Sequence, residues 1–169
     1  MIHPDPTPAT IARATEADLD GIVALQAANQ ISRGGILAAE LPRERIAQML
    51  HEMPLIVAKR EGRITGFLMT SARTMNADVP VVRAMFAAYA GAPDAYVYGP
   101  ICVDAAERGQ GLAPAMFAEL QHLAPGREGV LFIRNDNEAS LRAHRRMGMQ
   151  EVAAFELGGV GFAVFSYVA

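Results

Sequence analysis

Apolar residues recur along this chain with two different spacings, which separate the expected helices from the expected strands. Apolar positions three or four residues apart predict helices that begin near Thr15, Pro42 and Val79. Thr15 is an N-capping residue followed by carboxylates, and Pro42 suits the opening of a helix. Apolar runs predict strands over 10–14, 54–59 and 64–72, the last two around the turn Glu61-Gly62.

The second half contains a strand, a helix and a strand in close succession. The apolar runs 96–103 and 129–134 predict the two strands, and 111–123 predicts the helix. Two strands joined by a crossover helix form a βαβ unit, and such strands are normally parallel. The remaining expected elements are a helix over 137–147, its end at Gly148, and a hairpin of 152–156 with 162–168.

Length and composition limit both the fold and the partners. The chain has 169 residues, 51% of them hydrophobic, which is enough apolar material for one packed core. We therefore expect a loose, proline-rich lead-in over 1–9 and a single domain over 10–169. The formal net charge of −3 provides no general positive field, so we expect neither nucleic acid nor an anionic membrane as a partner.

The cysteine content and the first residues indicate the compartment. Cys102 is the only cysteine, which excludes an internal disulfide and a multi-cysteine metal site. The first residues lack the basic and apolar blocks of a signal peptide, and no apolar stretch is long enough to span a bilayer. The sequence therefore predicts a soluble, cytoplasmic protein.

The most informative segment is a glycine loop at residues 108–114, Arg-Gly-Gln-Gly-Leu-Ala-Pro. Gly109, Gly111 and the small Ala113 let the backbone approach a ligand closely. The helix that begins there directs unpaired N–H groups towards the same point, and its dipole favours an anion. The loop therefore predicts a phosphate or pyrophosphate site.

Other glycine motifs match this loop less well. A Walker loop requires a second glycine followed by Lys and Ser or Thr, and no such sequence is present. A dinucleotide fingerprint requires glycine where Pro114 stands and normally opens a domain. A turn whose glycines serve geometry alone is a further alternative.

Two motifs in succession carry a resemblance to a known family. The loop 108–113 resembles the Gln/Arg-x-x-Gly-x-Gly/Ala loop of the GNAT family of N-acetyltransferases. Residues 137–149, Asn-Glu-Ala-Ser-Leu-Arg-Ala-His-Arg-Arg-Met-Gly-Met, resemble the second motif of that family, Asn-x-x-Ala/Ser-Leu-x-x-Tyr/His-x-x-x-Gly-Phe. The first half of the chain agrees with the family in the order of its elements.

The resemblance implies an α/β fold of the α+β kind, with a mixed, mainly antiparallel sheet flanked by helices. It implies that the parallel strands of the βαβ unit splay apart and that acetyl-coenzyme A, the cosubstrate, lies between them. The resemblance implies no metal cofactor. The strand residues that would meet the pantetheine arm through their backbone are Ile101, Cys102 and Val103. The residues that would hold the pyrophosphate are Arg108, Gly109, Gln110, Gly111, Leu112 and Ala113. As a side chain, Cys102 is expected to be a buried small hydrophobe and not a nucleophile.

The second motif is expected to supply the chemistry. In family members with tyrosine at the position of His144, the hydroxyl protonates the departing thiolate, and an imidazole can do so if its facing nitrogen carries a proton. Asn137 is either a ligand of the pantetheine arm or a helix N-cap, and Ser140 belongs to the same motif. The nearby arginines, which either reach the 3′-phosphate or are solvated, are Arg142, Arg145 and Arg146.

The general base is not fixed by any motif. The candidates are Tyr98, Asp104 and Glu40, although Asp104 is also expected to begin the loop as a turn residue. The other histidines, His3, His51 and His122, are expected on the surface.

The leading hypothesis is direct transfer of an acetyl group to an amine in a ternary complex. The acceptor stays open between a small amine and a peptide, because the segments 29–42 and 75–93 that would shape its pocket contain no recognisable motif. The alternatives are a non-catalytic acyl-coenzyme A sensor and, last, a mononucleotide-binding domain. A homodimer is one assembly that the sequence leaves open.

Overall fold

The computed structural model describes residues 8–33, 37 and 40–169, and its residues cluster into two compact units. The first unit comprises Met1–Met69 and Pro100–Leu120, and the second comprises Thr70–Gly99 and Gln121–Ala169. Most of the lead-in expected over 1–9, together with His3 and part of the segment 29–42, lies outside the described residues. The single-domain expectation stays a prediction.

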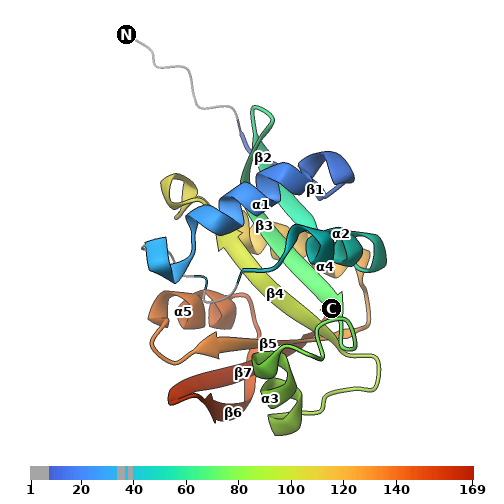
Figure 1. Cartoon of the computed structure of the whole chain (residues 1–169), viewed down its shortest axis with the longest axis vertical. Helices are drawn as coiled ribbons and strands as arrows, with labels where there is room; N and C mark the ends of the chain where they lie inside the picture. Colours follow the sequence, from blue (N-terminus) through green and yellow to red (C-terminus); the bar gives the residue numbers. More distant parts are fainter. Residues whose placement is uncertain (1–7, 34–36, 38–39) are drawn as a thin grey trace. The chain divides into compact units, whose positions relative to one another are not determined.

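The first unit combines an antiparallel group of strands with helices. Its elements are β1 (Thr10–Arg13), the 3-10 turn η1 (Glu16–Asp18), α1 (Leu19–Ala28), the 3-10 turn η2 (Ile31–Arg33), α2 (Arg43–Glu52), β2 (Ile56–Arg60), most of β3 (Arg63–Ala72), the end of β4 (Tyr96–Val103), the 3-10 turn η3 (Ala105–Glu107) and most of α4 (Leu112–Leu123). β1 pairs with β2 and β2 with β3, both antiparallel (Figure 1). Glu61 and Gly62 adopt φ values of 51° and 78°, which confirms the turn expected between β2 and β3.

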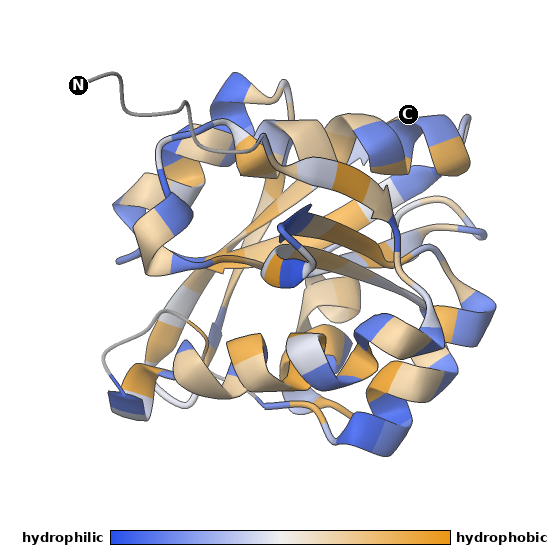
Figure 2. Cartoon of the chain, turned by 90° about the horizontal axis from the view of Figure 1, so that it is seen from above, coloured by the Kyte–Doolittle hydropathy of each residue, from blue (hydrophilic) through white to orange (hydrophobic). Residues whose placement is uncertain are grey.

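Packing in the first unit follows the apolar faces of its helices. Ile22 of α1, Ile46 of α2 and Met116 of α4 are fully buried, as the helical spacing predicts. A Cβ atom at Gly21 would lie 2.5 Å from the Ile64 side chain, so this glycine lets α1 approach β3 closely. Figure 2 shows the strands as mostly hydrophobic and the helices as alternating between hydrophobic and hydrophilic residues.

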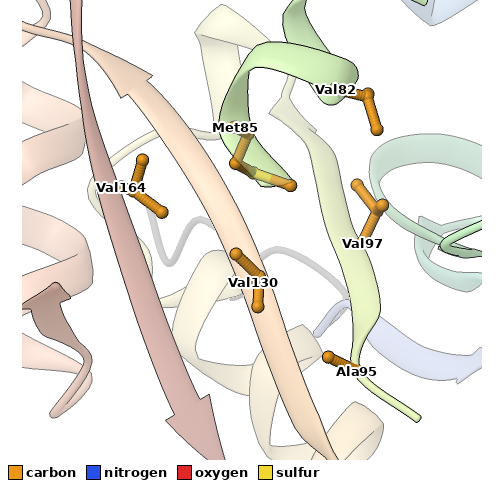
Figure 3. Packing of buried hydrophobic residues seen from close by; sticks show 6 residues of the cluster. All are labelled: Val82, Met85, Ala95, Val97, Val130 and Val164. Atoms are coloured by element: carbon orange, nitrogen blue, oxygen red, sulfur yellow. The ribbon is translucent and has the colours of Figure 1, made fainter. Parts of the chain in front are cut away.

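The second unit contains the remaining elements. They are α3 (Pro80–Ala88), the start of β4, β5 (Glu128–Arg134), α5 (Glu138–Arg146), β6 (Gln150–Leu157) and β7 (Val160–Val168). β5 pairs with β7 and β6 with β7, both antiparallel. In Figure 3, Val82 and Met85 of α3 lie against Val97, Val130 and Val164 of the strands, and all five side chains are buried. This cluster is the hydrophobic core beneath α3.

The βαβ prediction is confirmed by the pairing of β4 with β5. These strands are parallel, with Tyr96 opposite Gly129 and Val97 opposite Val130. Within the described part of the second unit, the two strands are paired at these two positions only. This short pairing agrees with the expected splay of the strands. Gly99, with a φ of 110°, and Pro100 follow these pairs within β4, and neither residue suits a regular central strand.

The strands found in the described residues have the order β1-β2-β3-β4-β5-β7-β6, and β3 and β4 each contribute residues to both units. One parallel pair among antiparallel pairs confirms the mixed, mainly antiparallel sheet with helices that the sequence predicts. None of the helices in the described ranges has the length and apolar character needed to cross a bilayer.

Candidate active site

One candidate region is the loop between β4 and α4, which lies in the first unit. Asp104 begins this loop and accepts a hydrogen bond from the Ala106 N–H at 3.3 Å. Its own N–H donates to the Thr65 carbonyl at 2.8 Å, and its carboxylate pairs with Arg63 at 3.0 Å. Asp104 is therefore a turn residue, as expected, and its carboxylate is already engaged by an arginine.

An ion pair between half-buried Arg60 and buried Glu107 links the loop to the β2–β3 hairpin. The Arg60 Nε atom donates to Glu107 Oε2 at 3.1 Å, and its Nη2 atom donates to Gln110 Oε1 at 3.1 Å. Glu107 is only 7% exposed, so this carboxylate is well shielded from water. Because both partners lie in the loop, Arg60 links the loop to β2.

The two loop glycines leave room for a ligand. Gly109 and Gly111 both adopt a φ of 77°, which side-chain-bearing residues rarely adopt. A Cβ atom built at either glycine meets no described heavy atom within 4 Å. α4 begins at Leu112, and its first turn directs backbone N–H groups towards the loop. These residues therefore fit a pyrophosphate group.

Arg108 is the cation of this loop, and its side chain is exposed. Its Nε atom donates to the Val103 carbonyl and its Nη2 atom to Asn29 Oδ1, both at 3.3 Å. Both acceptors are uncharged, so they do not compete with an anion for the positive charge of the guanidinium.

The last residues of β4 differ in how far their side chains are buried. Cys102 is buried and 1% exposed, whereas Ile101 and Val103 are half-buried. Burial raises the pKa of the Cys102 thiol to about 12, against a smaller opposing effect of Arg108. Cys102 is thus a protonated, enclosed thiol, as expected for a small hydrophobe. The backbone contacts expected for these three residues stay a prediction.

A separate candidate region is a buried pair, Tyr98 of β4 and His144 of α5, which both lie in the second unit. His144 is 3% exposed, although a histidine on a short helix is usually on the surface. Its Nε2 atom lies 3.1 Å from the Tyr98 hydroxyl, and the two rings meet edge to face at 5.5 Å. Its Nδ1 atom lies 2.7 Å from the Ser140 carbonyl oxygen.

These contacts determine where the protons are. A carbonyl oxygen can only accept, so Nδ1 of His144 donates to Ser140. Burial lowers the pKa of His144, outweighing the opposing effect of the Ser140 carbonyl, so the ring is neutral at neutral pH. Nε2 is then an acceptor, and the Tyr98 hydroxyl donates to it. Burial also raises the pKa of Tyr98, which keeps that hydroxyl protonated.

Tyr98 is held in place by aromatic neighbours that no motif indicated. The ring of Tyr167, on β7, meets Tyr98 edge to face at 5.8 Å, and its hydroxyl lies 2.5 Å from that of Tyr96. A Cβ atom at Gly129 would overlap the Tyr167 ring. Glycine at this position of β5 therefore makes room for the tyrosine that packs against Tyr98.

The other residues of the second motif have local roles. Asn137 is an N-cap of α5, since its Oδ1 atom accepts from the Ser140 N–H at 3.2 Å. Arg145 pairs with Glu151 at 3.2 Å, whereas Arg142 and Arg146 are exposed on the same helix. A role of Asn137 at the pantetheine arm, or of these arginines at the 3′-phosphate, stays a prediction.

The remaining candidate residues lie on the surface. Glu40 and His122 are exposed, and His51 is an exposed partner of Glu16 at 2.9 Å. In the described ranges, no group of three or more His, Cys, Asp or Glu side chains is arranged to hold a metal ion.

One buried carboxylate in the second unit escaped the sequence analysis. Glu128 accepts hydrogen bonds from the hydroxyls of Tyr89 and Ser166 at 2.6 and 2.5 Å, and from the Ala92 N–H at 2.6 Å. Burial alone would raise its pKa, but these donors and the charge of Arg73 outweigh burial and lower it. Through its hydrogen bonds with Tyr89 and Ala92, Glu128 holds the segment that follows α3. Its sequence context, at the start of an apolar strand, contains no signal of this role.

Comparisons with known proteins extend these observations. A model of the acetyltransferase (GNAT) family matches residues 24–149. No curated protein matches the chain. An N-acetyltransferase from Staphylococcus aureus Mu50 is 20% identical with a TM-score of 0.67, over 96% of this chain and 99% of that one.

Two further solved structures are similar over nearly their whole length. An acetyltransferase of the GNAT family from Streptococcus agalactiae 2603 is 16% identical with a TM-score of 0.72, over 95% of each chain. The yncA protein of Salmonella typhimurium, solved with its cofactor acetyl-CoA, is 17% identical with a TM-score of 0.67, over 96% of this chain and 94% of that one. At these identities the likeness shows the fold.

Proposed function

Since this chain belongs to the GNAT family of acetyltransferases, we propose that it transfers the acetyl group of acetyl-coenzyme A directly to an amine within a ternary complex. The observation that carries this proposal is the buried Tyr98–His144 pair, a neutral imidazole that accepts a hydrogen bond from a phenol. A site that only senses a ligand has no need of such a pair, whereas acyl transfer must move protons.

The loop of the first unit has the features that the donor requires. Arg108 and the backbone N–H groups at residues 109–113 would bind the pyrophosphate, and the backbone of residues 101–103 would meet the pantetheine arm. Acetyl-coenzyme A supplies the acyl group as a thioester. The structure of yncA with acetyl-CoA supports the same donor for this chain.

The proton balance of the reaction suggests which proton transfers the buried Tyr98–His144 pair would carry out. As the C–N bond forms and the C–S bond breaks, the amine loses a proton and the sulfur gains one. A direct donation by His144 requires a proton on Nε2, but in the neutral ring the proton lies on Nδ1, which faces Ser140. We therefore assign the donation at the sulfur to the Tyr98 hydroxyl. His144 orients that hydroxyl through Nε2. To balance the protons, Nε2 takes up the proton that the amine loses, and the resulting Nε2–H restores the Tyr98 hydroxyl after it has protonated the sulfur.

The acceptor is an amine in this proposal, supported by the family and by the N-acetyltransferase from Staphylococcus aureus. A small amine, an amino acid, and a peptide N-terminus or lysine all meet this description. The cytoplasmic location and a homodimeric assembly stay predictions.

The test has a binding part and a turnover part. Acetyl-coenzyme A should raise the melting temperature by mass action, and dephospho-coenzyme A should do so less. A panel of amines should then yield at least one that releases free thiol from acetyl-coenzyme A. No thermal shift at millimolar donor would refute the donor assignment. Tight binding without thiol release across the panel would favour the acyl-coenzyme A sensor.

A further inference from the structure

Asn29 connects the end of α1 with the cofactor loop, and both lie in the first unit. The side chain is buried, with 6% of the residue exposed. Its Nδ2 atom donates to the Leu25 carbonyl at 2.9 Å, and its backbone carbonyl accepts from the Leu37 N–H at 2.9 Å. Its Oδ1 atom accepts from Arg108 Nη2 at 3.3 Å. The amide is therefore fixed by the helix and offers one oxygen to the arginine.

Arg108 differs from the other arginines around the loop in the charge of its partners. Arg60 pairs with Glu107 at 3.0 Å and Arg63 with Asp104 at 3.0 Å, so carboxylates compensate both cations. Within the described ranges, no carboxylate forms a salt bridge with Arg108, whose acceptors are the Val103 carbonyl and the Asn29 amide. The loop thus contains one oriented guanidinium whose charge is not compensated.

We propose that Asn29 is a positioning residue that orients the Arg108 guanidinium for the pyrophosphate without neutralising it. The inference rests on the proposed function, because it needs the loop to bind a coenzyme A donor. Two bonds to a fixed amide and a fixed carbonyl reduce the rotamer freedom that a long, exposed arginine would otherwise lose on binding. A neutral oxygen provides this orientation, whereas a carboxylate would also compete with the phosphate for the charge.

A double-mutant cycle measured by calorimetry with coenzyme A tests this coupling. We expect Arg108→Ala to weaken binding about 10–100-fold, the usual scale for a charge-assisted hydrogen bond. Asn29→Ala should weaken binding by about 3–10-fold in the wild-type background, since the cation remains but is less well oriented. In the Arg108→Ala background it should cause no further loss. Independent, additive losses would overturn the inference.

Asn29→Asp separates orientation from charge. The carboxylate retains an oxygen for Arg108 and nearly the same shape, but it compensates the cation. We expect coenzyme A binding at least as weak as in Asn29→Ala, although the arginine is held firmly. Wild-type affinity in Asn29→Asp would overturn the inference. The melting temperature of each variant reports separately on the lost bond to Leu25.

Gln26→Ala is the matched control, because Gln26 is a buried amide one turn earlier on α1. Its side chain bonds the backbone N–H and carbonyl of Leu41, both at 2.9 Å, whereas Arg108 bonds Val103 and Asn29. This variant should lose stability but keep coenzyme A affinity, and an equal loss of affinity would show that Asn29 acts only through the helix. A wild-type protein that does not bind coenzyme A would refute the proposed function. Wild-type binding with an unaffected Asn29→Ala would refute the positioning role alone.

Discussion

The glycine loop at residues 108–114 and the Tyr98–His144 pair use polar groups in opposite ways. In the loop, Arg108 is exposed and charged, and Gly109 and Gly111 leave open space beside the backbone. In the pair, both side chains are buried and neutral, because burial lowers the pKa of His144 and raises that of Tyr98. Binding an anion requires an accessible charge, whereas controlled proton transfer requires groups sheltered from water. The contrast predicts that changes in the two regions affect different measurements.

The largest effect is expected at the buried pair. His144→Ala and Tyr98→Phe should each lower turnover by about 10²–10⁴-fold, the scale of a lost general acid or base, with little change in coenzyme A affinity. Steady-state kinetics with an accepted amine, together with calorimetry, would check this split. Turnover of Tyr98→Phe equal to that of the wild type would remove the hydroxyl from the mechanism.

His144→Gln refines this prediction. Glutamine can offer an oxygen to the Tyr98 hydroxyl but cannot exchange a proton near neutral pH. If His144 only orients the hydroxyl, the glutamine variant should recover most of the turnover that alanine loses. If His144 exchanges the proton, turnover should stay near the alanine level, which is the outcome we expect.

The next effect is expected at the loop and should concern binding. Gly111→Val should weaken coenzyme A binding by at least about 10–100-fold, because a branched side chain fills the space beside the backbone N–H groups. Gly126→Val is a matched control, since Gly126 has the same φ of 77° and equally open surroundings. Both variants should lose similar stability from backbone strain. Similar affinities in the two variants would argue against a ligand at Gly111.

A smaller effect is expected at Glu128, a buried carboxylate of the second unit, and it concerns the stability of the fold. Glu128→Gln should cost about 1–3 kcal/mol of unfolding free energy, since a neutral amide bonds the three donors less well. Because the pKa of Glu128 is lowered, its contribution is present above its usual pKa of 4.5 and is lost as pH falls through the native pKa. Urea unfolding at pH 7 and in mild acid would test both statements.

The smallest effect is the pH dependence due to His144. Its native pKa is lowered from 6.5, so below pH 6.5 the unfolded state binds more protons than the native state. Stability should therefore fall on acidification below pH 6.5 until the native pKa is passed, and this slope should be weaker in His144→Gln. Identical slopes for the two proteins would show that His144 is not buried in its neutral form.

The sequence by itself determined the elements and the motifs of this protein. Caps, glycine turns and apolar spacing act over a few residues, so the hairpin at Glu61-Gly62, the βαβ unit and the loop at Arg108 were predictable. The start of the first helix differed from the prediction. The chain forms a 3-10 turn at Glu16 and becomes α-helical only at Leu19.

Only the tertiary structure decided which partners the functional side chains have. His144 bonds Tyr98 from 46 positions away, and Arg108 bonds Asn29 from 79 positions away. The hydroxyl that faces Nε2 of His144, the neutral partner of Arg108 and the lowered pKa of Glu128 all depend on contacts between residues far apart in the sequence. Burial and partner charge are properties of packed neighbours, and no local pattern encodes them.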